Sequence, residues 1–95
     1  MATIVALLHL EFRLPAASNL KDKRRWVKGF KDRLGHHWNV SVAEISALDD
    51  RNRAVLAAAM VANDRRYLQG AMQKIVNTAN MHRDMVLMNH EIEWL

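Results

Sequence analysis

The alternation of residues 3–14 restricts the fold of this chain more than any other feature. In TIVALLHLEFRL every even-numbered residue from Ile4 to Leu14 is apolar, whereas the odd-numbered residues begin apolar and end charged. This period of two predicts a β-strand, because successive side chains of a strand point to opposite faces of its sheet. Pro15 has no amide hydrogen to donate to a neighbouring strand and is expected to end the segment. The first strand should therefore bury one face completely.

A basic amphipathic segment follows at residues 18–38 and predicts a helix. Ser18 or Asn19 can cap its N-terminus, and Gly35 is expected to end it, because glycine adopts a left-handed backbone without strain. Lys23 falls within the apolar stripe of the helix, so its stem is expected to carry the charge past the end of the packed surface into water. The rest of the stripe, which should face the core, is Leu20, Val27, Phe30 and Leu34.

Positive side chains gather on one flank of this helix instead of coating it evenly. A row of cations can follow the phosphates of structured RNA, and free N–H groups of the first helical turn can add a phosphate seat. The alternative is that the charged face is only solvated, and the sequence leaves both interpretations open. With Lys23 in the first turn, the predicted nucleic-acid contacts are Lys21, Lys23, Arg24, Arg25, Lys28 and Lys31.

The remaining segments complete the order strand, helix, strand, strand, helix, strand. Residues 53–62 are apolar at both parities, which favours a central strand over the helix that an Ala-rich run could also form. Asn63 or Asp64 is expected to cap the second helix, which runs to about Met81. The other two predicted strands are residues 38–47, with Val40 and Val42 on one side, and residues 84–94, with Val86, Met88, Ile92 and Trp94 on one side.

This order predicts one α+β domain over residues 1–95 with the ferredoxin-like arrangement β-α-β-β-α-β. The expected sheet is four-stranded and antiparallel with both helices on one face, and its first and third strands are expected to be central and parallel. Val5 and Leu7 then lie on the face without helices, together with either the odd-numbered or the even-numbered apolar residues of the third strand. A second copy is the simplest cover for that face, so the chain is expected to form a homodimer through it.

Three stretches stand out, S-N-L-K-D-K-R-R at residues 18–25, N-V-S-V-A-E at 39–44 and A-N-D at 62–64. They resemble the YlxP family, which is catalogued as a bacterial domain of unknown function, number 503. The resemblance spans the whole chain and implies a ferredoxin-like fold without established catalytic residues. Genes of that family often lie beside genes for transcription and translation factors, which implies a role linked to RNA or the ribosome. The turn A-L-D-D-R-N-R is less typical of the family, and no role is carried over to it.

Enzyme motifs are missing from the sequence. It has no Walker loop, dinucleotide turn or nucleophile elbow, and Leu14–Ser18 lacks the glycine that an acylphosphatase or a ligand-sensing domain of this fold would use. Trp26, Trp38 and Trp94 are dispersed and do not predict a sheet that stacks bases. We therefore expect no enzyme and no cofactor.

Metal binding and export are not expected either. Neighbouring His36 and His37 would diverge on a helix, and His9 and His90 could approach, with Glu11 and Glu91 nearby, if the first and last strands pair; surface histidines are the favoured interpretation. The chain has no cysteine, and its apolar start is interrupted too early for a signal peptide, so a cytoplasmic location is expected. The favoured function is a factor that binds RNA or the ribosome in assembly or translation. The alternative is a homodimeric protein-interaction module without nucleic-acid contact.

Overall fold

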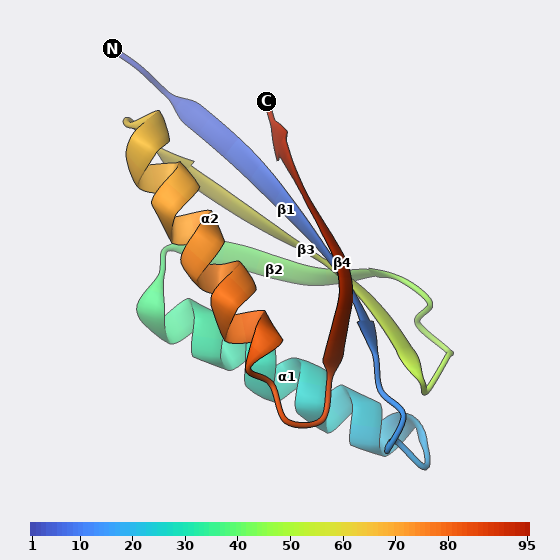
Figure 1. Cartoon of the computed structure of the whole chain (residues 1–95). Helices are drawn as coiled ribbons and strands as arrows, with labels where there is room; N and C mark the ends of the chain where they lie inside the picture. The colour runs from blue at the N-terminus through green and yellow to red at the C-terminus, as the bar shows by residue number, and fades with distance from the viewer.

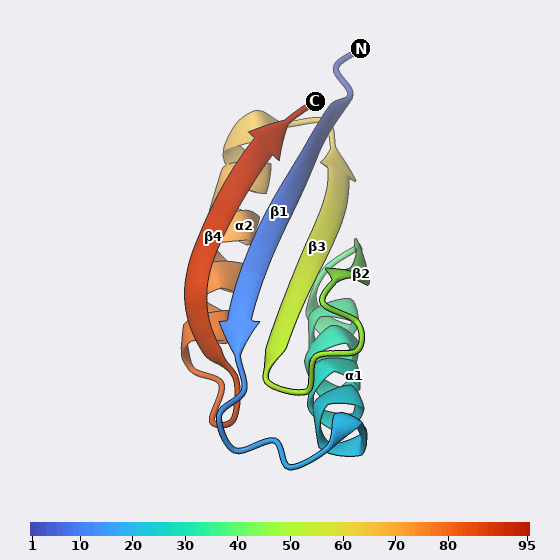
Figure 2. The ribbon, with the colours of Figure 1, turned by 90° about the vertical axis from the view of Figure 1, so that its right-hand side faces the viewer.

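A computed structural model of the whole chain, residues 1–95, contains six elements in the predicted order (Figure 1). They are β1 (Ile4–Arg13), α1 (Leu20–His37), β2 (Val40–Ser46), β3 (Arg53–Ala62), α2 (Arg65–Asn80) and β4 (Val86–Trp94). The four strands form one sheet in the order β2-β3-β1-β4. Both helices cover the same face of that sheet, and the other face is open (Figures 1 and 2). The ferredoxin-like α+β fold is thus confirmed.

One detail of the predicted sheet is wrong, because the two central strands are antiparallel. β1 pairs with β3 from Ile4 opposite Ala62 to Arg13 opposite Arg53 without a shift in register. The reason is the β2–β3 hairpin, which reverses the chain before β3 enters the sheet between β2 and β1. β4 also pairs with β1 in the antiparallel sense.

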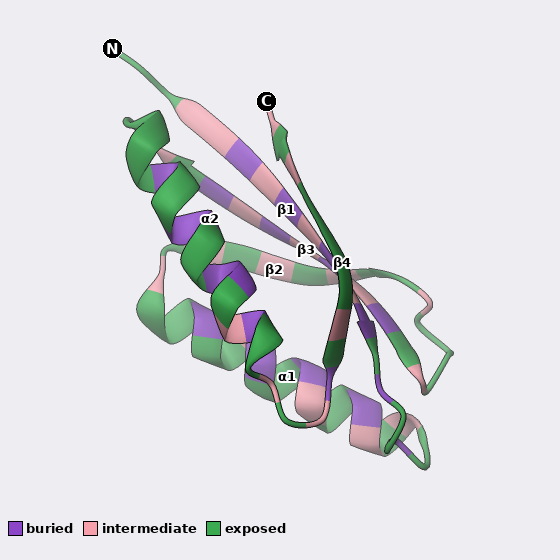
Figure 3. Cartoon of the chain, in the orientation of Figure 1, coloured by how far each residue is buried: buried purple, intermediate pink, exposed green.

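The alternation of β1 is confirmed by burial. Leu8, Leu10 and Phe12 are fully buried under the helices, while their odd-numbered neighbours are only partly covered. β3 follows the same rule, with Leu56 buried and Val55 partly exposed. The buried bands alternate along both strands and along the inner sides of the helices (Figure 3). The core therefore lies in one layer between the sheet and the two helices.

The N-terminus of α1 is capped as predicted, but its C-terminus is not. Asn19 accepts a hydrogen bond from the amide of Asp22 at 2.8 Å. Gly35 does not end the helix, which continues to His37 and passes into the extended backbone of Trp38 without a left-handed residue. The backbone ladder instead runs past Gly35, because the amide of Trp38 donates to the carbonyl oxygen of Leu34 at 2.9 Å, and Nδ1 of His36 and of His37 each donates to a carbonyl oxygen four residues earlier.

β4 departs from the predicted alternation at a bulge. Glu11 lies opposite Asn89, but the next residue of β1, Phe12, lies opposite Leu87. The extra residue, Met88, exchanges the residues of β4 that face the helices for those that face away, since a bulge places two residues opposite one. The prediction of one continuous apolar side was therefore wrong. Trp94 and Ile92 are half-buried, whereas Met88 and Val86 are exposed.

The loop between α2 and β4 is organised by His82. Its Nδ1 accepts hydrogen bonds from the amides of Asp84 and Met85, both at 3.0 Å, and its ring meets the edge of Phe30 at 6.2 Å. Burial lowers the pKa of His82, against the opposing effect of Asp84, which fits a neutral ring whose Nδ1 accepts. The sequence alone assigned this residue no role.

Candidate nucleic-acid interface

The outer surface of α1 carries a row of cations. Three buried side chains, Val27, Phe30 and Leu34, attach the opposite side of the helix to the sheet. With that side fixed, the 3.6-residue period turns the cations of the helix away from the core. We call this surface the basic face; it consists of Lys21, Arg24, Arg25, Lys28 and Lys31, of which only Lys31 is partly covered.

Two carboxylates partly neutralise the basic face. Arg25 lies 3.4 Å from Asp22, and Lys28 lies 2.7 Å from Asp32. The hydrogen bond from Lys28 holds the pKa of Asp32 below its usual value. Both pairs are at the surface, where water screens them and where such pairs contribute little. Lys21, Arg24 and Lys31 form no ion pair, so the face keeps an excess of positive charge.

Lys23 does not belong to this face, and its predicted exposure is wrong. Its side chain is 1% exposed, and its ammonium lies 2.7 Å from Oε2 of Glu44 on β2. It also donates to the carbonyl oxygens of Ala47 at 2.6 Å and Asp50 at 2.7 Å, and more weakly to that of Leu48. The β2–β3 loop folds over the first turn of α1, which prevents the stem from reaching water. Lys23 is a structural residue and is unavailable to RNA.

The N-terminus of α1 and the neighbouring β2–β3 loop together are poorly suited to bind a phosphate. Asn19 already accepts the amide of Asp22, and the Asp22 carboxylate accepts the amide of Ser18 at 3.0 Å. A hollow beside this helix end is lined by the further carboxylates of Asp49 and Asp50 and by one cation, Arg51. The excess of negative charge disfavours a phosphate at the helix end. The candidate interface is therefore the length of α1 rather than its first turn.

A comparison with known protein families identifies the family of this chain. Residues 5–92 match the family described as "Protein of unknown function (DUF503)", which covers β1 through most of β4. The chain belongs to the DUF503 family. No curated protein matches it. Both the basic face and the open face of the sheet lie within the matched DUF503 region.

Two histidines of this DUF503 domain share a hollow, because β1 pairs with β4. His9 and His90 line it together with Glu11 and Glu91, while His36 and His37 bond to the backbone of α1. No group of three His, Asp or Glu side chains is placed to hold a metal ion. Neither helix of the domain has the length and apolar character that crossing a bilayer requires.

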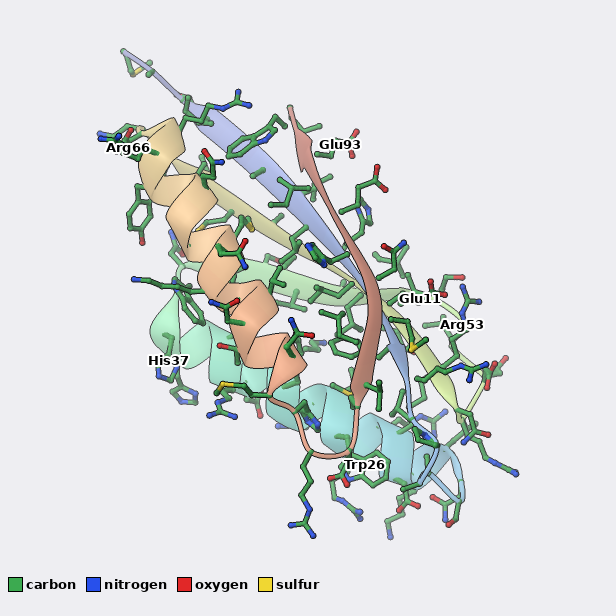
Figure 4. All side chains as sticks on the ribbon, viewed as in Figure 1. Glu11, Trp26, His37, Arg53, Arg66 and Glu93 are labelled. Carbon is green, nitrogen blue, oxygen red and sulfur yellow. The ribbon has the colours of Figure 1, made fainter.

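The open sheet face of the DUF503 domain (Figure 2) carries mostly apolar residues on its two central strands, with His9 among them. At one end an ion pair between Arg53 and Glu11, with Nη2 and Oε2 2.6 Å apart, bounds the apolar area (Figure 4). No element of the chain covers this face. Its central side chains are Val5, Leu7, Val55, Ala57, Ala59 and Val61, of which Val61 is 51% exposed.

Proposed function

We propose that this DUF503 protein binds structured RNA, free or within the ribosome, through the basic face of α1, and acts in ribosome assembly or translation. The observation that carries the proposal is the one-sided array of five cations, three of them without a carboxylate partner. An amphipathic helix needs only polar side chains of either sign on its outer side, whereas a row of phosphates needs cations there. The gene neighbourhood implied by the resemblance to YlxP proteins supports the same role.

The chemistry of the basic face favours contacts to the RNA backbone. No aromatic ring belongs to this face, because Trp26 is half-buried on the other flank of α1. Cations without base-stacking partners recognise phosphates and groove shape more than sequence. If about three to five phosphates are neutralised, the logarithm of affinity should fall with the logarithm of salt concentration at a slope of roughly −2 to −4.

Reversing two charges of the basic face should remove most of the RNA affinity. In the double variant Arg25→Glu and Lys28→Glu, we expect binding to a structured rRNA fragment to fall by more than about tenfold and the salt slope to shrink by about 2. Both residues are exposed, so the domain should stay folded. Electrophoretic mobility shifts over a salt series would measure the affinity, and circular dichroism the fold.

The matched control makes the same charge change elsewhere. Arg13→Glu with Arg83→Glu alters exposed residues at the end of β1 and in the α2–β4 loop. This control should keep most of the affinity. Equal losses in both double variants would contradict the proposal and indicate only general attraction to a basic protein. Co-sedimentation of the tagged protein with a ribosomal subunit or precursor would identify the cellular target.

The open sheet face supports a second candidate function, a homodimeric interaction module. Ala57 and Ala59 at the centre of the face are small, so a second sheet can approach to the usual spacing of about 10 Å. A two-fold axis would place the two apolar areas against each other and exclude water from both. The acidic side chains of β4, including the Glu93 labelled in Figure 4, would remain at the rim.

Light scattering tests the dimer directly. At tens of micromolar we expect the mass of two chains, because an apolar sheet face of this kind is seldom left uncovered. Val61→Lys, which places a charge at the most exposed position of the face, should shift the protein to a monomer without unfolding it. A monomer mass for the wild type at that concentration would exclude this interface.

A further inference from the structure

A groove opens between the C-terminal end of α1 and the outer side of α2. It has a volume of about 240 Å³ and lies where the two helices diverge (Figure 1). In Figure 4 the labelled His37 and Arg66 mark the ends of α1 and α2 on this side of the molecule. We call it the α1–α2 groove; it is lined by Trp38, Arg66, Tyr67, Gly70, Ala71 and Lys74.

Two aromatic rings and two cations line this groove, and no carboxylate does. Trp38 is half-buried and is held in place by the neighbouring ring of His37, with centroids 5.6 Å apart. Tyr67 is 56% exposed, so its ring is accessible to a ligand. Arg66 and Lys74 form no ion pair, so their charge is available to an anion. The groove is thus suited to a flat ring with a negative group attached.

Gly70 leaves part of the groove wall without a side chain. It lies in the middle of α2, where glycine weakens a helix relative to alanine. Neither packing nor backbone geometry requires it, because a Cβ at this position would meet nothing within 4 Å and its φ is not positive. What the missing side chain does provide is open space on the helix surface that borders the groove.

We propose that the α1–α2 groove binds an unpaired nucleotide of RNA. The base would stack on Tyr67 above Trp38, and its phosphate would lie between Arg66 and Lys74. Stacking on aromatic side chains accepts any base, and it is the usual way in which proteins hold single-stranded RNA. The inference rests on the proposed RNA function, which it extends from helical RNA on the basic face to an unpaired nucleotide in a separate groove that no residue of the basic face lines.

The test compares two RNAs of equal length. Fluorescence anisotropy with a labelled 12-nucleotide oligo(A) reports single-strand binding, and a labelled 12-base-pair duplex reports binding to the basic face. Tyr67→Ala should weaken single-strand binding by on the order of tenfold and leave duplex binding unchanged. Tyr67→Phe, which keeps the ring, should bind both RNAs as the wild type does. Arg66→Gln should lower the salt slope for the single strand by about 1.

Gly70→Leu tests the groove without removing a ring or a charge. The added side chain should fill the open space and weaken single-strand binding, whereas Gln69→Leu, on the opposite flank of α2, should not. If both Tyr67→Ala and Gly70→Leu bound oligo(A) with wild-type affinity, the proposed nucleotide site in the groove would be wrong, even if the Arg25→Glu and Lys28→Glu variant still lost duplex binding. If only the groove variants lost affinity, the nucleotide site would be supported and RNA binding by the basic face would be wrong.

Discussion

Replacing Lys23 with Met is expected to lower the free energy of unfolding by about 3–5 kcal/mol. Met keeps most of the stem and its packing but removes the ammonium. The carboxylate of Glu44 then lacks its partner, and its Oε2 is buried with no other hydrogen bond in the structure. The carbonyl oxygens of Ala47 and Asp50 also lose their donor. A buried charge without a partner costs more than the lost attraction alone, because it remains out of water.

Urea unfolding followed by circular dichroism measures this loss. Lys21→Met is the matched control, because Lys21 is exposed and its substitution should change stability by less than about 0.5 kcal/mol. Adding Glu44→Leu to Lys23→Met should recover part of the loss, since the unpaired carboxylate is then gone. If Lys23→Met unfolded at the urea concentration of the wild type, the buried ion pair would not be present in solution.

Truncation of Phe30 to Ala should cost about 3–5 kcal/mol through lost burial and a cavity. Phe30 is 2% exposed and meets the ring of Phe12 edge-to-face, with centroids 5.4 Å apart. It also supports His82, which orders the loop before β4. The substitution therefore removes the contact that joins α1 to both the sheet and the last connection of the fold.

Thermal and urea melts of two further variants give the comparison. Phe30→Leu keeps much of the volume and should cost less than about 1.5 kcal/mol. Tyr67→Ala removes an aromatic ring from the surface and should have little effect on stability. A wild-type melting temperature for Phe30→Ala would mean that α1 is rotated about its axis from the orientation described.

Periodicity alone was enough to determine the element order and the buried faces of β1 and α1, whereas in β3, which is apolar on both sides, only pairing with β1 decided which side faces the helices. The reason is that a strand repeats every two residues and a helix every 3.6, so one apolar set identifies the core face wherever the period is unbroken. The sequence also limited each N-cap to two neighbouring residues, of which the structure shows Asn19 and Asp64, because capping depends on residues a few positions apart. The cations of the basic face could be placed on one side of α1 from the same 3.6-residue period. Local rules sufficed wherever the partners of a residue are its sequence neighbours.

Only the tertiary structure determined the features that depend on distant residues. Lys23 lies within the apolar stripe of α1. Only the β2–β3 loop, more than twenty residues away in sequence, supplies the carbonyl oxygens that accept hydrogen bonds from its buried ammonium. The bulge at Met88 is set by pairing with β1, so no pattern within β4 reveals it. Trp38 and Tyr67 belong to separate helix ends and line one groove only after the helices pack. In each case the decisive contact joins segments whose separation in sequence carries no periodic signal.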